Sequence, residues 1–194
     1  MKRINNHLLL LLAAAALLTA TAVSCTKTEI VETMTNIEAL EEDYATMVKH
    51  FPELDRTFVE AQYELNGILS QAPAESLHPD RVDYVCYYKP EGYKTGYVAY
   101  MHREFCDCQA PTIIYTNSES DWSEDIYITN FKGFITLAQA IAIVKSQGKH
   151  VPDTRYVTLR HPAGEDSPRY IFGGTPDRES EIHVDARTGE IFEK

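Results

Sequence analysis

Two short segments of alternating apolar residues, Glu181–Val184 and Glu190–Phe192, flank a five-residue turn close to the C-terminus. Asp185 can accept hydrogen bonds from the backbone that follows it, and Gly189 can adopt the positive φ angle that such a turn requires. The alternation predicts an antiparallel hairpin with one buried face. His183 alternates with its apolar neighbours, so we expect it to face solvent or the open side of the sheet. The end of the chain is thereby committed to an antiparallel sheet.

A helix is expected upstream of this hairpin. Thr136 and Gln139 have the spacing of a capping box, in which each side chain satisfies a backbone N–H of the other residue. Apolar residues recur at helical spacing after Thr136, and Gly148 is well placed to end the helix. Further strands are expected over residues 155–160 and 169–172. The segment therefore reads as one helix followed by four strands.

The N-terminal half is expected to repeat this order. Apolar residues between Ile37 and Phe51 predict a helix, and a second helical run extends from Leu54 to Ile68. Pro52 either begins that second helix or kinks one long helix. Strands are expected over residues 82–88, 97–105, 111–116 and 125–129.

The predicted fold class is therefore α+β, with an internal repeat whose units span residues 36–130 and 134–194. Each unit is expected to form an antiparallel four-stranded sheet. One face of each sheet would be covered by its helix, and the other face would be open.

The second unit resembles the PepSY domain. That family begins with a pattern like Ile-Thr-Leu-x-x-Ala, here residues 135–140, and ends with strands like Glu-x-x-Val-Asp-Ala-x-Thr-Gly-Glu-Ile, here residues 181–191. The first unit lacks the Asp-x-x-Thr-Gly turn and is at best a diverged copy. The tandem arrangement is similar to the PepSY-like, beta-lactamase-inhibitor-protein-like lipoproteins of gut bacteria. This resemblance implies a small exported module that binds proteins or restrains peptidases and has no catalytic residues of its own.

The N-terminus has the pattern of a secretory signal peptide. Two basic residues precede an apolar run from Leu8 to Leu18, and small residues lead to Cys25. This ending resembles the lipobox of bacterial lipoproteins, which implies cleavage before Cys25 and lipid attachment to it. Residues 1–24 would then be the signal peptide and residues 25–35 a polar tether. We expect a lipid-anchored protein of the bacterial cell envelope, on the outer membrane, with its periplasmic or surface orientation left open. An ordinary signal peptide cut nearby is the alternative.

The charge of the chain restricts its partners. The net charge is −11, and it becomes −13 when Lys2 and Arg3 are removed with the signal peptide. Such an acidic chain lacks the basic surface that nucleic acids require, and anionic lipid would repel it. We therefore expect membrane contact only through Cys25 and no nucleic-acid partner. No cofactor is expected, and the expected partner is another envelope protein.

Three candidate sites involve the cysteines and the acidic residues. His102, Cys106 and Cys108 could bind zinc, although their spacing matches no established pattern, and a surface histidine with two structural thiols is the favoured interpretation. A disulfide, if one forms, is expected from Cys86 to Cys106 or Cys108. The acidic segment 117–125 could bind calcium, but it lacks the glycine and the final glutamate of an EF-hand loop and is interpreted as a solvated loop. No nucleophile–base motif is present, so a non-enzymatic protein is predicted.

Tyrosines are concentrated in the first predicted sheet, and alternation cannot place them all in the core. Tyrosine is enriched at protein interfaces. We therefore predict a partner-binding surface there, with ordinary half-buried strand residues as the alternative reading. The candidate residues are Tyr84, Tyr88, Tyr93 and Tyr97. The predicted function is a protein-binding or peptidase-inhibitor-like module. The alternatives are an enzyme or metal site around His102, Cys106 and Cys108, and a small-ligand carrier with an apolar cavity between helix and sheet.

Overall fold

The structure is a computed structural model that describes residues 37–94, 96–104, 112–117, 126–148, 151–173 and 181–193. The predicted signal peptide, Cys25, the tether, Cys106, Cys108 and the acidic residues 118–125 lie outside the described residues. Neither described helix is long and apolar enough to cross a membrane.

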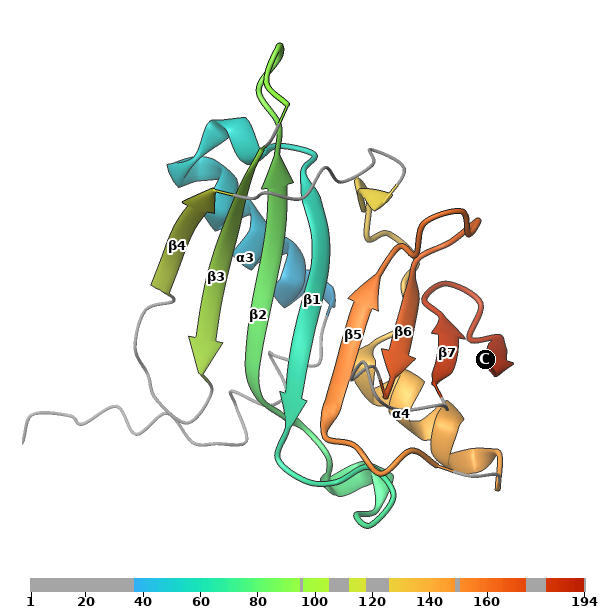
Figure 1. The fold of residues 1–194 in the computed structure, drawn as a ribbon. Coiled ribbons are helices and arrows are strands. Elements are labelled where there is room, and N and C mark those ends of the chain that lie inside the picture. Colours follow the sequence, from blue (N-terminus) through green and yellow to red (C-terminus); the bar gives the residue numbers. More distant parts are fainter. Residues whose placement is uncertain are drawn as a thin grey trace, which may run out of the picture.

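The described chain runs twice through a helix followed by four strands (Figure 1). The first run consists of α3 (Ile37–His50), η1 (Pro52–Leu54), β1 (Phe58–Leu65), η2 (Ala74–Ser76), β2 (Pro79–Tyr88), β3 (Tyr97–Glu104) and β4 (Thr112–Asn117). The second run consists of α4 (Leu137–Ser146), β5 (Tyr156–Arg160), β6 (Arg169–Phe172), β7 (Ile182–Asp185) and β8 (Ile191–Glu193). The predicted α+β class is confirmed.

All the strands belong to one eight-stranded sheet with the order β4-β3-β2-β1-β5-β6-β7-β8, and every neighbouring pair is antiparallel. The expectation of two separate sheets was wrong, because β1 and β5, the first strand of each run, pair with each other. In that pair Gln62 lies opposite Thr158. An unpaired edge strand exposes a row of N–H and C=O groups, and joining two such edges satisfies both rows.

The prediction of a second helix in the first run was wrong, because β1 occupies most of that segment. The predicted second helix from Leu54 to Ile68 is instead a single 3-10 turn and the strand Phe58–Leu65, and α3 ends at His50, so the kinked long helix was also wrong. Ala61, Tyr63 and Leu65 are buried whereas the residues between them are more exposed, which is the period of a strand.

The predicted strand over residues 125–129 is also absent, since residues 127–129 have no regular structure. Ile128 instead enters the core and its N–H donates to the Phe58 carbonyl at 2.9 Å. With β1 the first run still has four strands, as predicted, but β1 comes first in the run, whereas the predicted strand over residues 125–129 would have come last.

Both helices lie on the same side of the sheet (Figure 1). Leu40 and Met47 of α3 and Ile141 of α4 belong to one apolar core, which also holds Tyr63, at the centre of the sheet, and Tyr170 of β6. This continuous core buries one face of the sheet, and neither helix covers the opposite face.

A buried polar contact connects α3 to the sheet within this core. Asp43 retains 7% of its surface, accepts a hydrogen bond from the Tyr84 hydroxyl at 3.0 Å, and forms an ion pair with Arg103 of β3. The pairing satisfies a carboxylate that would otherwise be costly to bury.

The local signals of the second run are confirmed. The Thr136 side chain accepts from the Gln139 N–H at 3.2 Å, and the Gln139 side chain accepts from the Thr136 N–H at 2.7 Å. Gly148 has a φ of 61° just beyond α4. Asp185 accepts from the N–H groups of Arg187 and Thr188 at 2.8 and 2.7 Å, and Gly189 has a φ of 75°.

Candidate binding face

The face of the sheet opposite the helices has a regular arrangement of side chains at its centre. Ala61, Tyr63 and Leu65 point into the helix-side core, so the alternate residues of β1 point the other way. The register of β2, β1 and β5 places these residues in three rows. The rows are Arg81, Glu64 and Tyr156; Asp83, Gln62 and Thr158; and Val85, Glu60 and Arg160. We call eight of these side chains, all except the buried Val85, the central open face.

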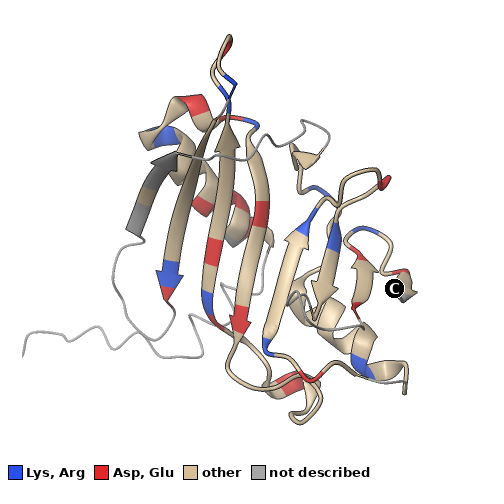
Figure 2. Cartoon of the chain, in the orientation of Figure 1, with Lys and Arg blue, Asp and Glu red and all other residues tan. Residues whose placement is uncertain are grey.

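Charged residues dominate this face, and most of them are paired. Arg81 contacts Asp83 at 3.1 Å and Glu64 at 3.7 Å, and Glu64 also accepts from Arg155 at 3.1 Å. The acidic residues of β1 and β2 lie in the middle of the sheet (Figure 2). These side chains are 20–43% exposed, so each pair adds little to stability. Their main effect is to hold the charged groups of the face in fixed positions.

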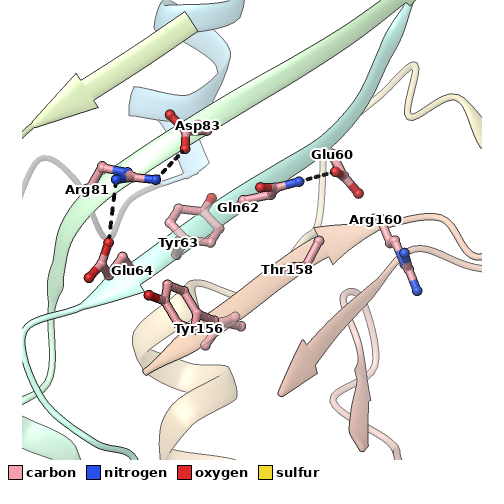
Figure 3. A pocket seen from close by; sticks show the side chains of 10 residues that line it. Glu60, Gln62, Tyr63, Glu64, Arg81, Asp83, Tyr156, Thr158 and Arg160 are labelled. Atoms are coloured by element: carbon pink, nitrogen blue, oxygen red, sulfur yellow. Dashed lines mark hydrogen bonds and ion pairs between the residues drawn. The ribbon is translucent and has the colours of Figure 1, made fainter. Parts of the chain in front are cut away.

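A hollow of about 250 Å³ lies in this face between β2, β1 and β5. Gln62 and Thr158 occupy the middle row, between Glu64 and Tyr156 on one side and Glu60 and Arg160 on the other (Figure 3). The hollow is therefore a consequence of the β1–β5 pairing, because it is lined by residues from both halves of the chain.

Glu60 is the least exposed charged residue of the hollow, with 9% of its surface accessible. One of its carboxylate oxygens accepts a hydrogen bond from the Gln62 side-chain amide. Arg160 lies opposite Glu60 in the neighbouring strand, but its guanidinium points away from the carboxylate (Figure 3). Among the described residues, no cation lies within ion-pair distance of Glu60.

His102 extends the face onto β3, where it lies opposite Asp83. Its Nδ1 lies 2.6 Å from Asp83 Oδ1, and its Nε2 lies 3.4 Å from Glu104 Oε1. The other two predicted zinc ligands, Cys106 and Cys108, lie outside the described residues. Within the described part of the chain, no group of three or more metal-ligating side chains is gathered at one place.

The four candidate tyrosines do not form one surface. Tyr84 is a correction to the prediction, because it is 1% exposed and points into the helix-side core. Tyr88 is half-buried against the same core, and its partner across the hairpin, Tyr97, is half-buried as well. Tyr93 is 61% exposed and belongs to the β2–β3 loop, which projects beyond the sheet (Figure 1). A role of these residues in partner binding stays a prediction.

Two exposed tyrosines that the sequence reading did not select lie on the open face instead. Tyr156 in the central open face is 46% exposed, and Tyr100 of β3 is 37% exposed. Tyr100 also lies opposite Ile114 of β4, which is 51% exposed. The alternation of Tyr156 with the buried Val157 was a signal that could have identified it. For Tyr100 the signal was its alternation with the buried Ala99 and Met101 in the predicted strand over residues 97–105.

Two flanking regions of the open face are covered, whereas Tyr100 and Ile114 on the β3–β4 side are exposed. On one side Val59, Val85 and Tyr87 pack with Ile126 and Tyr127. On the other side the Arg169 guanidinium lies 4.1 Å from the centre of the Phe192 ring and 2.6 Å from a Glu165 oxygen.

His183 lies on this second flank, opposite Ile171 and Phe192 in the neighbouring strands. It is 2% exposed, so of the two places expected for it, solvent or the open side of the sheet, the second is the one that it occupies. Its Nε2 lies 2.9 Å from a Glu181 oxygen. The accessible part of the described open face therefore runs from β5 across β1 and β2 to Tyr100 on β3 and Ile114 on β4.

Two remaining predictions concern Cys86 and a ligand cavity. Cys86 is a free, fully buried thiol, so it is not bridged to Cys106 or Cys108 in this structure, and burial raises its pKa to about 12. A second hollow of about 520 Å³ lies between α3 and residues 129–131. Its lining mixes apolar side chains such as Val48 and Phe131 with the charged Glu41, Lys49 and Asp55, and it opens beside α3 and not between helix and sheet.

Comparison with known proteins bears on the second run of elements. Residues 134–194 match the PepSY family model, described as the peptidase propeptide and YPEB domain. This confirms the resemblance seen in the sequence. The PepSY segment covers less than half of the chain and contains α4 and β5 to β8. A PepSY domain suggests a peptidase-propeptide or inhibitor-like module. Searches of curated proteins and of solved structures found no match.

Proposed function

We propose that this protein is a non-enzymatic binding module of the bacterial envelope, held to the outer membrane by lipid on Cys25. The module consists of two tandem helix-plus-four-strand units, and its open sheet face docks another envelope protein. A peptidase is the first candidate for that partner, because the PepSY domain is a propeptide or inhibitor-like module.

The observation that carries the proposal is the polar, accessible part of the open face across β3, β2, β1 and β5. The sheet presents ion-paired charges, a hollow and two exposed tyrosines there, Tyr100 and Tyr156. Protein interfaces combine aromatic anchors in well-formed hollows with a polar surround. The net charge of −11 favours a partner with a basic surface, because complementary charge speeds association.

The arrangement of the open face also supports a role other than catalysis. His102 is held between Asp83 and Glu104. Among the described residues, the side-chain partners of His102 are two carboxylates, whereas a nucleophile activated by a histidine would be a hydroxyl or thiol group. The carboxylates of the face are engaged with neighbouring side chains, which suits a surface that recognises a partner by fixed charges.

Site-directed photocrosslinking in cells that produce the protein tests the docking face. A photoreactive amino acid at Thr158 is expected to capture a discrete protein, because Thr158 lies in the hollow. The same amino acid at Ala142, which is exposed on α4 on the opposite side of the sheet, is the control and is expected to capture nothing specific. Capture from Ala142 alone, or from neither position, would contradict the proposal.

Two further measurements test the anchor and the peptidase. The variant Cys25→Ala is expected to move the protein from the membrane fraction to the soluble fraction and to end incorporation of labelled palmitate. Purified protein added to an envelope extract is expected to lower hydrolysis of fluorescent casein. An unchanged rate at saturating protein would remove peptidase restraint from the proposal and leave protein binding to the crosslinking test.

A further inference from the structure

We infer that the hollow between β2, β1 and β5 receives a single lysine or arginine side chain of the docked protein, with Glu60 as the carboxylate that pairs with it. The inference rests on the proposed docking of a protein at this face. It adds the chemistry of the residue at the centre of the contact.

Glu60 is a nearly buried carboxylate at the edge of the hollow. Its side chain lines the hollow, is 9% exposed, and accepts one hydrogen bond from Gln62. An ionised carboxylate offers about four acceptor positions, so most of the capacity of Glu60 is unused by described residues. A buried carboxylate without a cation is unfavourable, and a cation from outside the chain would remove that cost.

The other charges around the hollow make a positive ligand the best match. Arg81 is shared by Glu64 and Asp83, and Glu64 has a second cation in Arg155. The guanidinium of Arg160 points away from Glu60, so it does not occupy the position of the incoming cation (Figure 3). The lining thus holds three carboxylates and two guanidinium groups, with Glu60 as the carboxylate that lacks a cation.

The shape and the remaining lining suit one long basic side chain. About 250 Å³ is enough for a single side chain and too little for a folded loop. Tyr156, 46% exposed, borders the hollow across the middle row from Glu60 and offers an aromatic ring. The apolar stem of a lysine or arginine can pack against such a ring. Gln62 and Thr158 between them supply oxygen acceptors for the remaining N–H groups of a lysine or arginine.

The test is an NMR titration of the purified protein with the peptide acetyl-Gly-Arg-Gly-amide. We expect the backbone amides of Gln62 and Thr158 and the Gln62 side-chain amide to shift in a saturable manner. Acetyl-Gly-citrulline-Gly-amide, which has the same shape without the charge, is expected to bind at least about tenfold more weakly, and acetyl-Gly-Glu-Gly-amide is expected not to bind there.

Three variants keep the result interpretable. Glu60→Gln preserves the size of the side chain and is expected to weaken the arginine peptide at least about tenfold, whereas Glu104→Gln, on the same face outside the hollow, is expected to leave it unchanged. Thr158→Lys keeps Glu60 and places an ammonium group inside the hollow, so it is expected to block the peptide. Spectra of the free variants show whether each one is folded.

Specific outcomes would overturn the inference. These are equal binding of the citrulline and arginine peptides, stronger binding of the glutamate peptide, absence of any shift, or full binding to Glu60→Gln. If the peptide test fails while a crosslinker at Thr158 still captures a protein, the basic side chain is wrong and the docking face stands. If crosslinking at Thr158 fails, the proposed docking itself is wrong.

Discussion

The buried contact of Asp43 with Tyr84 and Arg103 allows a quantitative test of the core. In Arg103→Met the Asp43 carboxylate, whose side chain is 10% exposed, loses its cation and keeps the Tyr84 hydroxyl. Breaking a buried pair from one side costs roughly 3–5 kcal/mol. Because Arg103 is 30% exposed, water can reach part of the site, and we expect a loss of about 2–3 kcal/mol in the free energy of unfolding.

Urea denaturation followed by far-UV circular dichroism measures this loss, and the thermal midpoint should fall by about 5–10 °C. Arg81→Met is the matched control, because that arginine is 43% exposed on the open face, and it should cost at most about 1 kcal/mol. The double variant Asp43→Asn/Arg103→Met should lose less than the two single losses combined, since it leaves no unpaired buried charge. If Arg103→Met is as mild as Arg81→Met, the contact does not stabilise the fold as argued.

Three further predictions concern the second run and the core thiol. Burial raises the pKa of Asp185, but hydrogen bonds from Ser167 and two backbone N–H groups outweigh it and hold the pKa below 3.8. Asp185→Ala should therefore cost about 2 kcal/mol at pH 7, and the charge-dependent part of this deficit should shrink as urea midpoints are measured at pH values falling below 3.8. Thr136→Ala should cost about 1 kcal/mol through loss of the capping box, whereas Thr136→Ser should cost much less. Cys86, with its pKa raised by burial to about 12, should resist iodoacetamide at pH 8 in the native protein and react in urea, as measured by peptide mass spectrometry; native alkylation would contradict its burial.

The predictions that succeeded rest on local chemistry. The capping box of Thr136 and Gln139 and the turn of Asp185 and Gly189 are each determined by a few neighbouring residues. The β2–β3 hairpin was similarly legible from alternation and turn residues.

The prediction for β1 failed because the same residues fit both the helical and the strand spacing of apolar side chains. Leu54, Phe58, Ala61 and Leu65 recur at helical spacing, while Ala61, Tyr63 and Leu65 also alternate as in a strand. Pairing with β2 and β5 decided in favour of the strand, and no local signal contains that information.

The same failure hid the candidate site. Glu60, Gln62 and Glu64 were assigned to a helix, so they could not be placed beside Thr158 and Tyr156 from the other half of the chain. Tyr84, predicted for the binding surface, points to the core, whereas Tyr156 points to the open face. Which face a strand residue occupies follows from register, and the register here depends on the joining of the two halves.

Hydroxyl-radical footprinting of the protein with and without its crosslinked partner tests the docking face most directly. The account predicts that oxidation of Tyr156 and Tyr100, which are 46% and 37% exposed, falls strongly in the complex, while oxidation of the α3 and α4 surfaces does not change. Unchanged oxidation of both tyrosines, with protection on the helices instead, would show that the partner binds the other side of the sheet and would contradict the account.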